Sequence, residues 1–489
     1  MTAFIPEDYG GFAPRFFGVT VRVHSEEDFA LLEAYITDRP GKHDERSLKS
    51  ISLKSVLDHE TRHFHDFLIS PYGGFAFRCK LQAAVHGLGL MGILKEVPGD
   101  WLPTPLVAWC AMDENVREQY LDEWRAALGD SFSVPQLPDV RQIDFSSLGD
   151  FAEIDLERSK PDAALAILIE TVRRSYSRLQ ELTQGMVIEP GSAELTPCNF
   201  FEVLALAAQV QAIWRGQSAD CALIFLKMLE GSDAAYAKLW RRILALASRL
   251  PNPHASDESP SVIDQMVAIV MWCTFGNFKI DNIRACPNFR FLLLENFLKN
   301  NGGDEDLVYN ADLLWQRWDA ALSVPTWRHG IEGAAASNKA HAERLSRIRS
   351  DAITSIASEI LKVFCRDQEK CLQQFFKNPN LLVRQELYVE SSVEAGLPVP
   401  SVRFESSGFK IPCPSGGSWA PMWDDSPVSQ VVLRRGGDAD GFVLQSVNLE
   451  RMIQLSDLVM AGQEPPRGLS RFARDDIQSF VRKKPIWIV

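Results

Sequence analysis

The sequence contains no apolar run long enough to cross a lipid bilayer. Its longest apolar stretches, Phe200–Ile213 and Met266–Phe275, fall short of the roughly 20 residues that a membrane-spanning helix requires. The first ten residues carry neither a basic segment nor an apolar core, so we expect no secretory signal peptide. Nine cysteines are scattered without a Cys-x-x-Cys pair, as is typical of reduced thiols. These absences predict a cytoplasmic protein without membrane contact.

A surplus of positive charge is also absent. The formal net charge is −13, whereas nucleic-acid binding calls for a basic surface. No phosphate-binding GxxxxGK[ST] loop, no GxGxxG after a strand and no GxSxG nucleophile turn occurs. The twelve tryptophans lack accompanying basic residues, so we interpret them as core rather than as a base-stacking surface. We therefore expect no nucleic-acid partner and no nucleotide cofactor.

The patterns that are present predict a mainly α fold. At 489 residues, with 46% hydrophobic and 24% charged residues, the chain has the composition of a globular protein with a large helical body. Near the N-terminus, Arg15–Val23 has the composition of a β-strand. We expect an N-terminal region over 1–128, a loop or boundary over 129–160, a helical domain over 161–396 and a small α+β C-terminal cap over 397–489.

One stretch carries a chemical pattern, His59-Glu60-Thr61-Arg62-His63. Histidines four residues apart on a helix lie one turn apart on the same face, so both imidazoles can reach a single Zn²⁺. Glu60 follows the first histidine and can take a proton from water held on the open side of the metal. The spacing predicts a metal site with His59 and His63 as ligands and Glu60 as the catalytic base.

The surrounding residues indicate how this helix is buried. On a helical wheel, Val56, Phe64 and Phe67 form part of an apolar arc that also contains Glu60, with both motif histidines at its margin. A carboxylate within an apolar arc needs a partner. The opposite face is predicted to be solvated, and we interpret His65 there as a surface histidine and not as a ligand; that face comprises Lys54, Asp58, Thr61, Arg62 and His65.

The motif helix resembles the active-site helix of the zincins, the broad group of HExxH zinc metallopeptidases, and the likeness covers this helix alone. The resemblance implies a zinc cofactor, a protein or peptide substrate and hydrolysis of peptide bonds. The rest of the chain matches no family that we recognise from sequence.

A catalytic zinc needs a third protein ligand, and Glu202 is the best candidate. It lies in a helix that is apolar nearly all round, where an ionised carboxylate requires compensation by a cation or hydrogen bonds. Gln209 shares its face and would line the same cavity. The arrangement is similar to the gluzincins, in which a later helix supplies a glutamate, although Leu206 stands where thermolysin-like members have an aspartate. Pairing of Glu202 with an arginine or a backbone group is the alternative.

Other residues are weaker candidates. Asp66 is placed to orient a metal histidine or to act as an alternative ligand, and a solvated role is also open. Tyr72 and His86 follow the motif helix and are candidates for stabilising a developing oxyanion, together with Arg78. Three acidic residues in apolar helical settings remain open as ligands: Glu170, Asp264 and Glu295.

From these patterns we expect a selective cytoplasmic metallopeptidase of mainly helical structure. The alternative is a non-catalytic helical scaffold or interaction protein in which the histidine cluster is structural or vestigial. Metal content separates the two, because only the first requires a stoichiometric metal that depends on His63.

Overall fold

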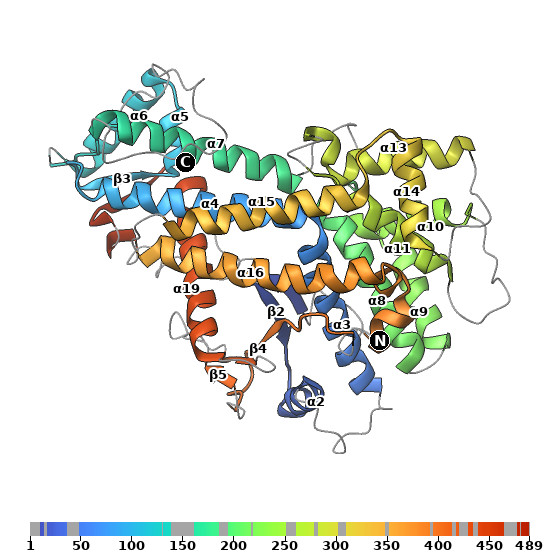
Figure 1. The fold of residues 1–489 in the computed structure, drawn as a ribbon. Helices are drawn as coiled ribbons and strands as arrows, with labels where there is room; N and C mark the ends of the chain where they lie inside the picture. Colours follow the sequence, from blue (N-terminus) through green and yellow to red (C-terminus); the bar gives the residue numbers. More distant parts are fainter. Residues whose placement is uncertain are drawn as a thin grey trace. The chain divides into compact units, whose positions relative to one another are not determined.

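We analysed the protein in a computed structural model. It describes residues 10–13, 17–36, 48–129, 131–137, 161–184, 194–216, 219–250, 261–277, 282–301, 310–347, 352–391, 395–412, 417–419, 429–433, 439–463, 477–479 and 481–488. Within this part the architecture is mainly α with a small β element, as the sequence predicts (Figure 1).

The chain forms two compact units, each assembled from separate segments. The first unit comprises residues 1–77, 181–348 and 358–447, and the second comprises 78–180, 349–357 and 448–489. This division differs from the consecutive regions expected from the sequence. The expected C-terminal cap, residues 397–489, is shared between the two units.

The helices that lie wholly in the first unit, among the described residues, are α2 (Glu26–Ile36), α3 (Leu48–Ile69), α8 (Pro197–Gly216), α9 (Ala219–Glu230), α10 (Ala235–Ala247), α11 (Ser261–Thr274), the 3₁₀ helix η2 (Asn282–Ala285), α13 (Pro287–Asn301), α14 (Ala311–Ala321), α15 (Trp327–Arg347), α17 (Asn380–Val383) and α18 (Gln385–Ser391). The second unit contains α5 (Leu106–Ala111) and α6 (Glu114–Leu128). Helices that contribute to both units are α4 (Pro71–Leu94), α7 (Pro161–Gln184), α16 (Ala352–Lys377) and α19 (Ala439–Ala461).

A five-stranded sheet in the first unit joins the two ends of the sequence. Its strand order is β1-β2-β4-β6-β5, and its strands are β1 (Gly10–Ala13), β2 (Gly18–Arg22), β4 (Ser401–Ser406), β5 (Gly417–Trp419) and β6 (Ser429–Leu433). The central pair β2 and β4 is parallel, with Val19 opposite Val402 and Val21 opposite Phe404. In the second unit β3 (Trp101–Thr104) pairs in parallel with β7 (Lys484–Trp487).

The sheet packs on the N-terminal half of α3. Leu53 and Leu57 of this helix share a buried core with β-branched and aromatic residues of the strands, including Val21, Phe404 and Val431. Helix α2 covers the same core through Phe29, whose ring lies 5.1 Å from that of Phe404. Its first turn is capped, because the backbone N–H of Asp28 donates to Ser25 Oγ at 3.2 Å.

A single residue, Ser70, joins the motif helix α3 to the next helix, α4. Ser70 follows the last residue of α3, and its hydroxyl accepts a hydrogen bond from the backbone N–H of Gly73 at 3.3 Å. Pro71 occupies the first helical position of α4, where its missing N–H costs nothing. Helix α4 therefore starts directly after α3, although the proline and glycines of residues 70–74 favour a longer turn there.

Several expected elements differ from the structure. The residue pattern over 338–364 predicts one helix, whereas the structure has two, α15 and α16. Residues 442–447 have a β-like composition but belong to α19. The pattern over 105–128 also predicts one helix, but the structure has strand β3 before it and two helices, α5 and α6. Residues 138–160 of the expected boundary region lie outside the described residues, as do most of residues 471–481, whose pattern predicts a helix.

Candidate metal centre

Helices α3 and α8 pack against each other and run in opposite directions. Near one end of the pair, a Cβ added at Gly216 of α8 would lie 2.8 Å from Ile51 Cγ2 of α3. Near the other end, Glu202 of α8 reaches the motif histidines of α3. The glycine permits close approach of the helices at the C-terminal end of α8.

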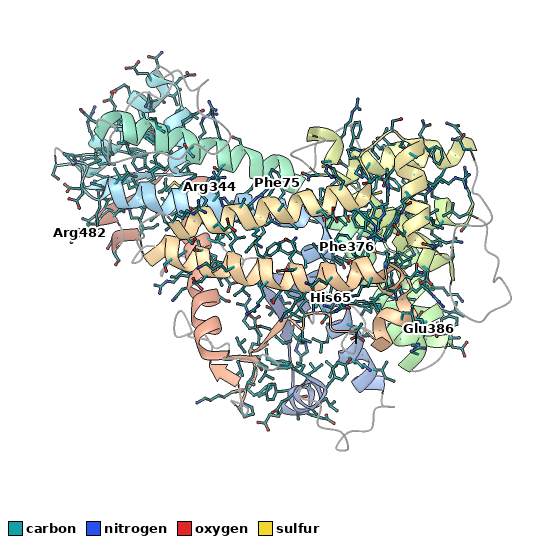
Figure 2. All side chains as sticks on the ribbon, in the orientation of Figure 1. His65, Phe75, Arg344, Phe376, Glu386 and Arg482 are labelled. Carbon is teal, nitrogen blue, oxygen red and sulfur yellow. The ribbon has the colours of Figure 1, made fainter. Side chains whose placement is uncertain are left out.

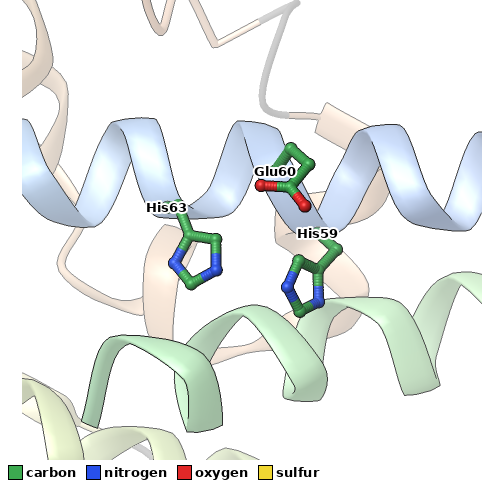
Figure 3. Close-up of side chains that lie close together, drawn as sticks. All are labelled: His59, Glu60 and His63. Atoms are coloured by element: carbon green, nitrogen blue, oxygen red, sulfur yellow. The ribbon is translucent and has the colours of Figure 1, made fainter. Parts of the chain in front are cut away.

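Glu202 meets both motif histidines with its single carboxylate. His59 Nε2 lies 3.3 Å from Glu202 Oε1, and His63 Nε2 lies 3.3 Å from Glu202 Oε2. The imidazole rings are 4.8 Å apart between centroids and nearly perpendicular, at 82°. Both rings project from α3 toward α8, the green helix in Figure 3. The structure thus brings together the three side chains that the sequence proposed as metal ligands.

The separation between these atoms fits a tetrahedral metal site better than a hydrogen-bonded pair. Ligand atoms at about 2.0–2.1 Å from a tetrahedral Zn²⁺ are about 3.4 Å from one another. A charged N–H···O hydrogen bond is shorter, at about 2.7–2.9 Å. Two imidazole nitrogens and a carboxylate oxygen also form a donor set that zinc commonly takes. The residues present therefore fit a zinc ion by both spacing and chemistry.

Glu60 completes the cluster. Ligand-type atoms of His59, Glu60 and His63 all lie within 4.8 Å of one another, and Glu60 is 2% exposed. Its burial agrees with its place in the apolar arc of α3. The side chain leaves the same helix beside the histidines (Figure 3), so it stands next to any group that the imidazoles hold.

Exposure increases across the cluster from one side to the other. The His59 side chain is 1% exposed, His63 is 14% and Glu202 is 25%. Burial raises the pKa of Glu202, but the neighbouring imidazoles of His59 and His63 outweigh this and lower its pKa well below the ordinary value. The lowered pKa keeps Glu202 ionised, and its side chain is the most exposed of the three.

Comparison of this chain with protein-family models, curated proteins and solved structures found no match. The site must therefore be interpreted from its own geometry.

The prediction that the face of α3 opposite its apolar arc is solvated was wrong for Arg62 and His65. The rest of this face is exposed at Lys54 and partly exposed at Asp58 and Thr61. Arg62 is fully buried and His65 is 2% exposed, because α11 and residues 380–391 cover this side of the helix. Asp66 is 3% exposed and pairs with Arg62 at 2.9 Å, so its expected solvated alternative is also wrong. Its carboxylate compensates a buried guanidinium.

His65 is held as a neutral imidazole. Its Nε2 lies 2.8 Å from the carbonyl oxygen of Pro398, which can only accept, so Nε2 carries the proton. Its Nδ1 then accepts from the Tyr388 hydroxyl at 2.9 Å. Burial lowers the pKa of His65 to about 4, which keeps the ring neutral. His65 is not part of the cluster, as predicted, but it is a core residue (Figure 2).

The other acidic candidates are engaged elsewhere. Glu170 pairs with Arg173 and Arg174, and Glu295 pairs with Arg242. Asp264 accepts a hydrogen bond from the backbone N–H of Gln385 at 3.0 Å. These contacts account for the three carboxylates without a metal.

The candidates for oxyanion stabilisation have different environments. Tyr72 is 6% exposed, and its ring lies 6.2 Å from that of Phe201, the neighbour of Glu202. His86 and Arg78 belong to the second unit, outside the metal cluster. Gln209 is fully buried on α8, and neither its amide nor His59 Nδ1 has a hydrogen-bond partner among the described residues.

Residues 380–391 were missed by the sequence analysis, although they contact the motif helix through Leu382, Gln385 and Tyr388. One signal for this contact was available. Arg62 and Asp66 are opposite charges at (i, i+4) spacing, which allows them to be buried together as a pair.

Proposed function

We propose that this protein is a zinc-dependent hydrolase with His59, His63 and Glu202 as metal ligands. The observation that carries the proposal is the convergence of two imidazole nitrogens from α3 on one carboxylate from α8, each at 3.3 Å. The spacing of these atoms suits a tetrahedral ion, and the ionised state of Glu202 supplies the negative charge that a divalent cation needs.

The chain's own residues then have distinct roles. A bound zinc ion would supply Lewis acidity, polarising a carbonyl and acidifying water. Glu60, buried beside both histidines, would accept a proton from the attacking water and pass it to the leaving group. Glu202 would hold its position from a second helix, so that the cluster depends on the packing of α3 against α8.

We propose the peptide bond as the substrate class, because the motif helix resembles that of the zincins. His59 is almost fully covered and even Glu202, the most exposed of the three, is only 25% exposed, which supports a selective rather than a digestive peptidase. We further propose that it acts in the cytoplasm, where unrestricted proteolysis would damage the cell.

The first test is the metal content of protein purified without added metal. We expect about one zinc per chain in the wild type and a loss of at least tenfold in affinity in His63→Ala, because one of three protein ligands is removed. His329→Ala is the matched control, since this histidine is exposed and lies on α15. Wild-type protein that folds but takes up no zinc in dialysis would favour the non-catalytic scaffold instead.

The second test separates metal binding from catalysis. Glu60→Gln retains the shape of the side chain but cannot accept a proton, so we expect full zinc content and a loss of roughly 10²–10⁴-fold in peptide turnover. Turnover of a peptide library by mass spectrometry provides the measurement. Undiminished turnover in this variant would remove Glu60 from the reaction.

A further inference from the structure

A fully buried arginine lies inside the metal-binding motif. Arg62 Nε donates to Asp66 Oδ2 at 2.9 Å, and its Nη1 donates to the carbonyl oxygen of Leu382 at 2.7 Å. The same Nη1 lies 3.4 Å from Gln385 Oε1. The guanidinium, with its donors in a planar fork, thereby links α3 to both α17 and α18.

A second residue of α3 reaches the same segment. His65 accepts from the hydroxyl of Tyr388, and the ring of Tyr388 stacks under the guanidinium of Arg62, 4.7 Å from it. Arg62 and His65 therefore attach one face of the motif helix to residues 380–391. We call this segment, α17 and α18, the α17–α18 bracket.

The bracket also holds the helix that carries Glu202. Helix α18 packs against α8, and Arg215 near the end of α8 donates to Glu386 Oε1 at 2.8 Å. This pair is partly exposed, with Glu386 on the outer side of the bracket (Figure 2). Such pairs contribute less than buried ones, so the attachment of α8 depends mainly on helix packing.

The bracket is itself anchored to a third helix. Its Gln385 backbone N–H donates to Asp264 of α11 at 3.0 Å, and α17 packs against α11. Met271 of α11 contacts Arg62 from another side, with 3.5 Å between its sulfur and Nη2. The segment is thus fixed by α11 while it contacts both metal-bearing helices.

We propose that the α17–α18 bracket sets the spacing of α3 and α8, and that Arg62 is the positioning residue through which it aligns His59 and His63 with Glu202. The effect of the bracket on metal binding rests on the proposed function, whereas its effect on the packing of α3 against α8 does not. Arg62 lies within one turn of both histidines, three residues after His59 and one before His63, so a rotation or shift of α3 moves both imidazoles together. A metal site tolerates displacements of only about 0.5 Å.

The experiment compares Arg62→Met with Arg290→Met in the metal-free full-length protein. Arg290 is the matched control because it is also buried, at 1% exposure, donates to the carbonyl oxygen of Trp272 and belongs to the same unit. Hydrogen exchange is measured by mass spectrometry on peptides from α3 and α8. Binding of Co²⁺ is then followed by its visible absorption, which reports ligand geometry.

We expect Arg62→Met to accelerate exchange at least tenfold in both α3 and α8, although the substitution touches only α3. It should also weaken Co²⁺ binding at least tenfold and change the absorption spectrum, neither of which Arg290→Met should do. If Arg62→Met does not fold, Arg62→Met/Asp66→Leu removes both buried charges and should change exchange in α3 and α8 in the same direction.

Exchange that rises in α3 alone, or equally in Arg290→Met, would overturn the bracket. If the wild type binds Co²⁺, an unchanged absorption spectrum together with unchanged Co²⁺ affinity in Arg62→Met would also overturn the bracket. If the wild type takes up no Co²⁺, the zinc proposal fails, and the exchange comparison still decides whether the bracket couples the two helices.

Discussion

Buried ionisable side chains in this protein differ in how their charge is compensated. Glu202 faces two imidazoles, and Asp66 faces the guanidinium of Arg62. His86, by contrast, has a buried Nδ1 without a hydrogen-bond partner among the described residues. An uncompensated group of this kind avoids charge by shifting its pKa, so it makes the stability of the fold depend on pH.

We expect His86 to destabilise the second unit in mild acid. Burial lowers the pKa of His86 to about 4, below the value of about 6.5 in an unfolded chain. Between pH 6.5 and pH 4 the unfolded chain binds a proton at His86 that the folded protein does not. The stability that the neutral His86 contributes is therefore complete above pH 6.5 and is lost as the pH falls to 4. Because the side chain is only partly covered, we expect a loss of about 1–3 kcal/mol.

The measurement is urea unfolding at pH 7.5, 6 and 5. His86→Leu should reduce the acid sensitivity of the second unit, whereas His329→Leu at an exposed site should leave it unchanged. Equal acid sensitivity in His86→Leu and wild type would contradict this assignment.

Single residues also show what the sequence could reveal of the site. Glu202 could be identified because a carboxylate in an almost wholly apolar helix requires a partner, and the structure brings that partner to it. Arg62 could not be placed in the same way. A charged residue opposite an apolar arc normally faces water, and here it is removed from solvent by distant residues, Met271 and 382–388, which no local pattern links to α3.

Among the elements, α11, α14 and α15 meet at an aromatic cluster. The ring of Phe275, just after α11, lies 4.9 Å from that of Trp315 and 5.7 Å from that of Trp327. Such edge-on and tilted contacts stabilise helix crossings beyond the area they bury. The cluster agrees with the interpretation of the tryptophans as core residues.

Gly330 permits the close approach of α15 to the end of α11. A Cβ at this position would lie 2.5 Å from the carbonyl oxygen of Phe275, a backbone atom that cannot rotate away. Alanine normally favours a helix over glycine by about 1 kcal/mol, but here we expect Gly330→Ala to destabilise the first unit by about 1–3 kcal/mol.

Chemical denaturation measures this effect, with Gly231→Ala as the control in the same unit. A Cβ there would make only an ordinary contact, 3.4 Å from the carbonyl oxygen of Lys227. A Gly330→Ala protein that is more stable than the wild type would show that α15 and the end of α11 can move apart without loss of stability.

Helix content was more predictable than helix ends. Apolar periodicity extends through residues 338–347 and 352–364, so one helix was predicted where α15 and α16 are separate. Residues 442–447 are rich in aromatic and β-branched residues, yet α19 includes them, because a local β preference depends strongly on context. No helix among the described residues combines the length and apolar character needed to span a bilayer.

On the scale of the whole molecule, we expect the two units to unfold separately. The candidate metal site of His59, His63 and Glu202 lies in the first unit, while the ion pair of Lys80 with Asp457 lies in the second. We expect two unfolding transitions in calorimetry. A chelator should lower only the first unit's transition, by about 4 kcal/mol if free zinc was at 1,000 times its dissociation constant. Asp457→Asn should lower only the other.

His63→Ala provides the control for this experiment, because its first-unit transition should no longer respond to a chelator. One cooperative transition that moves as a whole in every variant would contradict the independence of the units.

The mainly α class followed from the sequence, but the topology did not. The pairing of β2 with β4 joins residues about 380 positions apart, and two short β-rich segments give no indication of which strand each will join. Each unit likewise combines segments that are distant in the sequence, and no local pattern indicates which segments will join.

The parallel pairing of β2 with β4 also bears on synthesis of the chain. During translation β2 and α3 leave the ribosome long before residues 401–433, so the core that they share lacks the side chains of β4 and β6 until late in elongation. Ribosome-bound fragments that end before residue 400 should therefore leave one edge of β2 unpaired. We expect chaperones to bind such fragments more strongly than fragments that extend beyond residue 433.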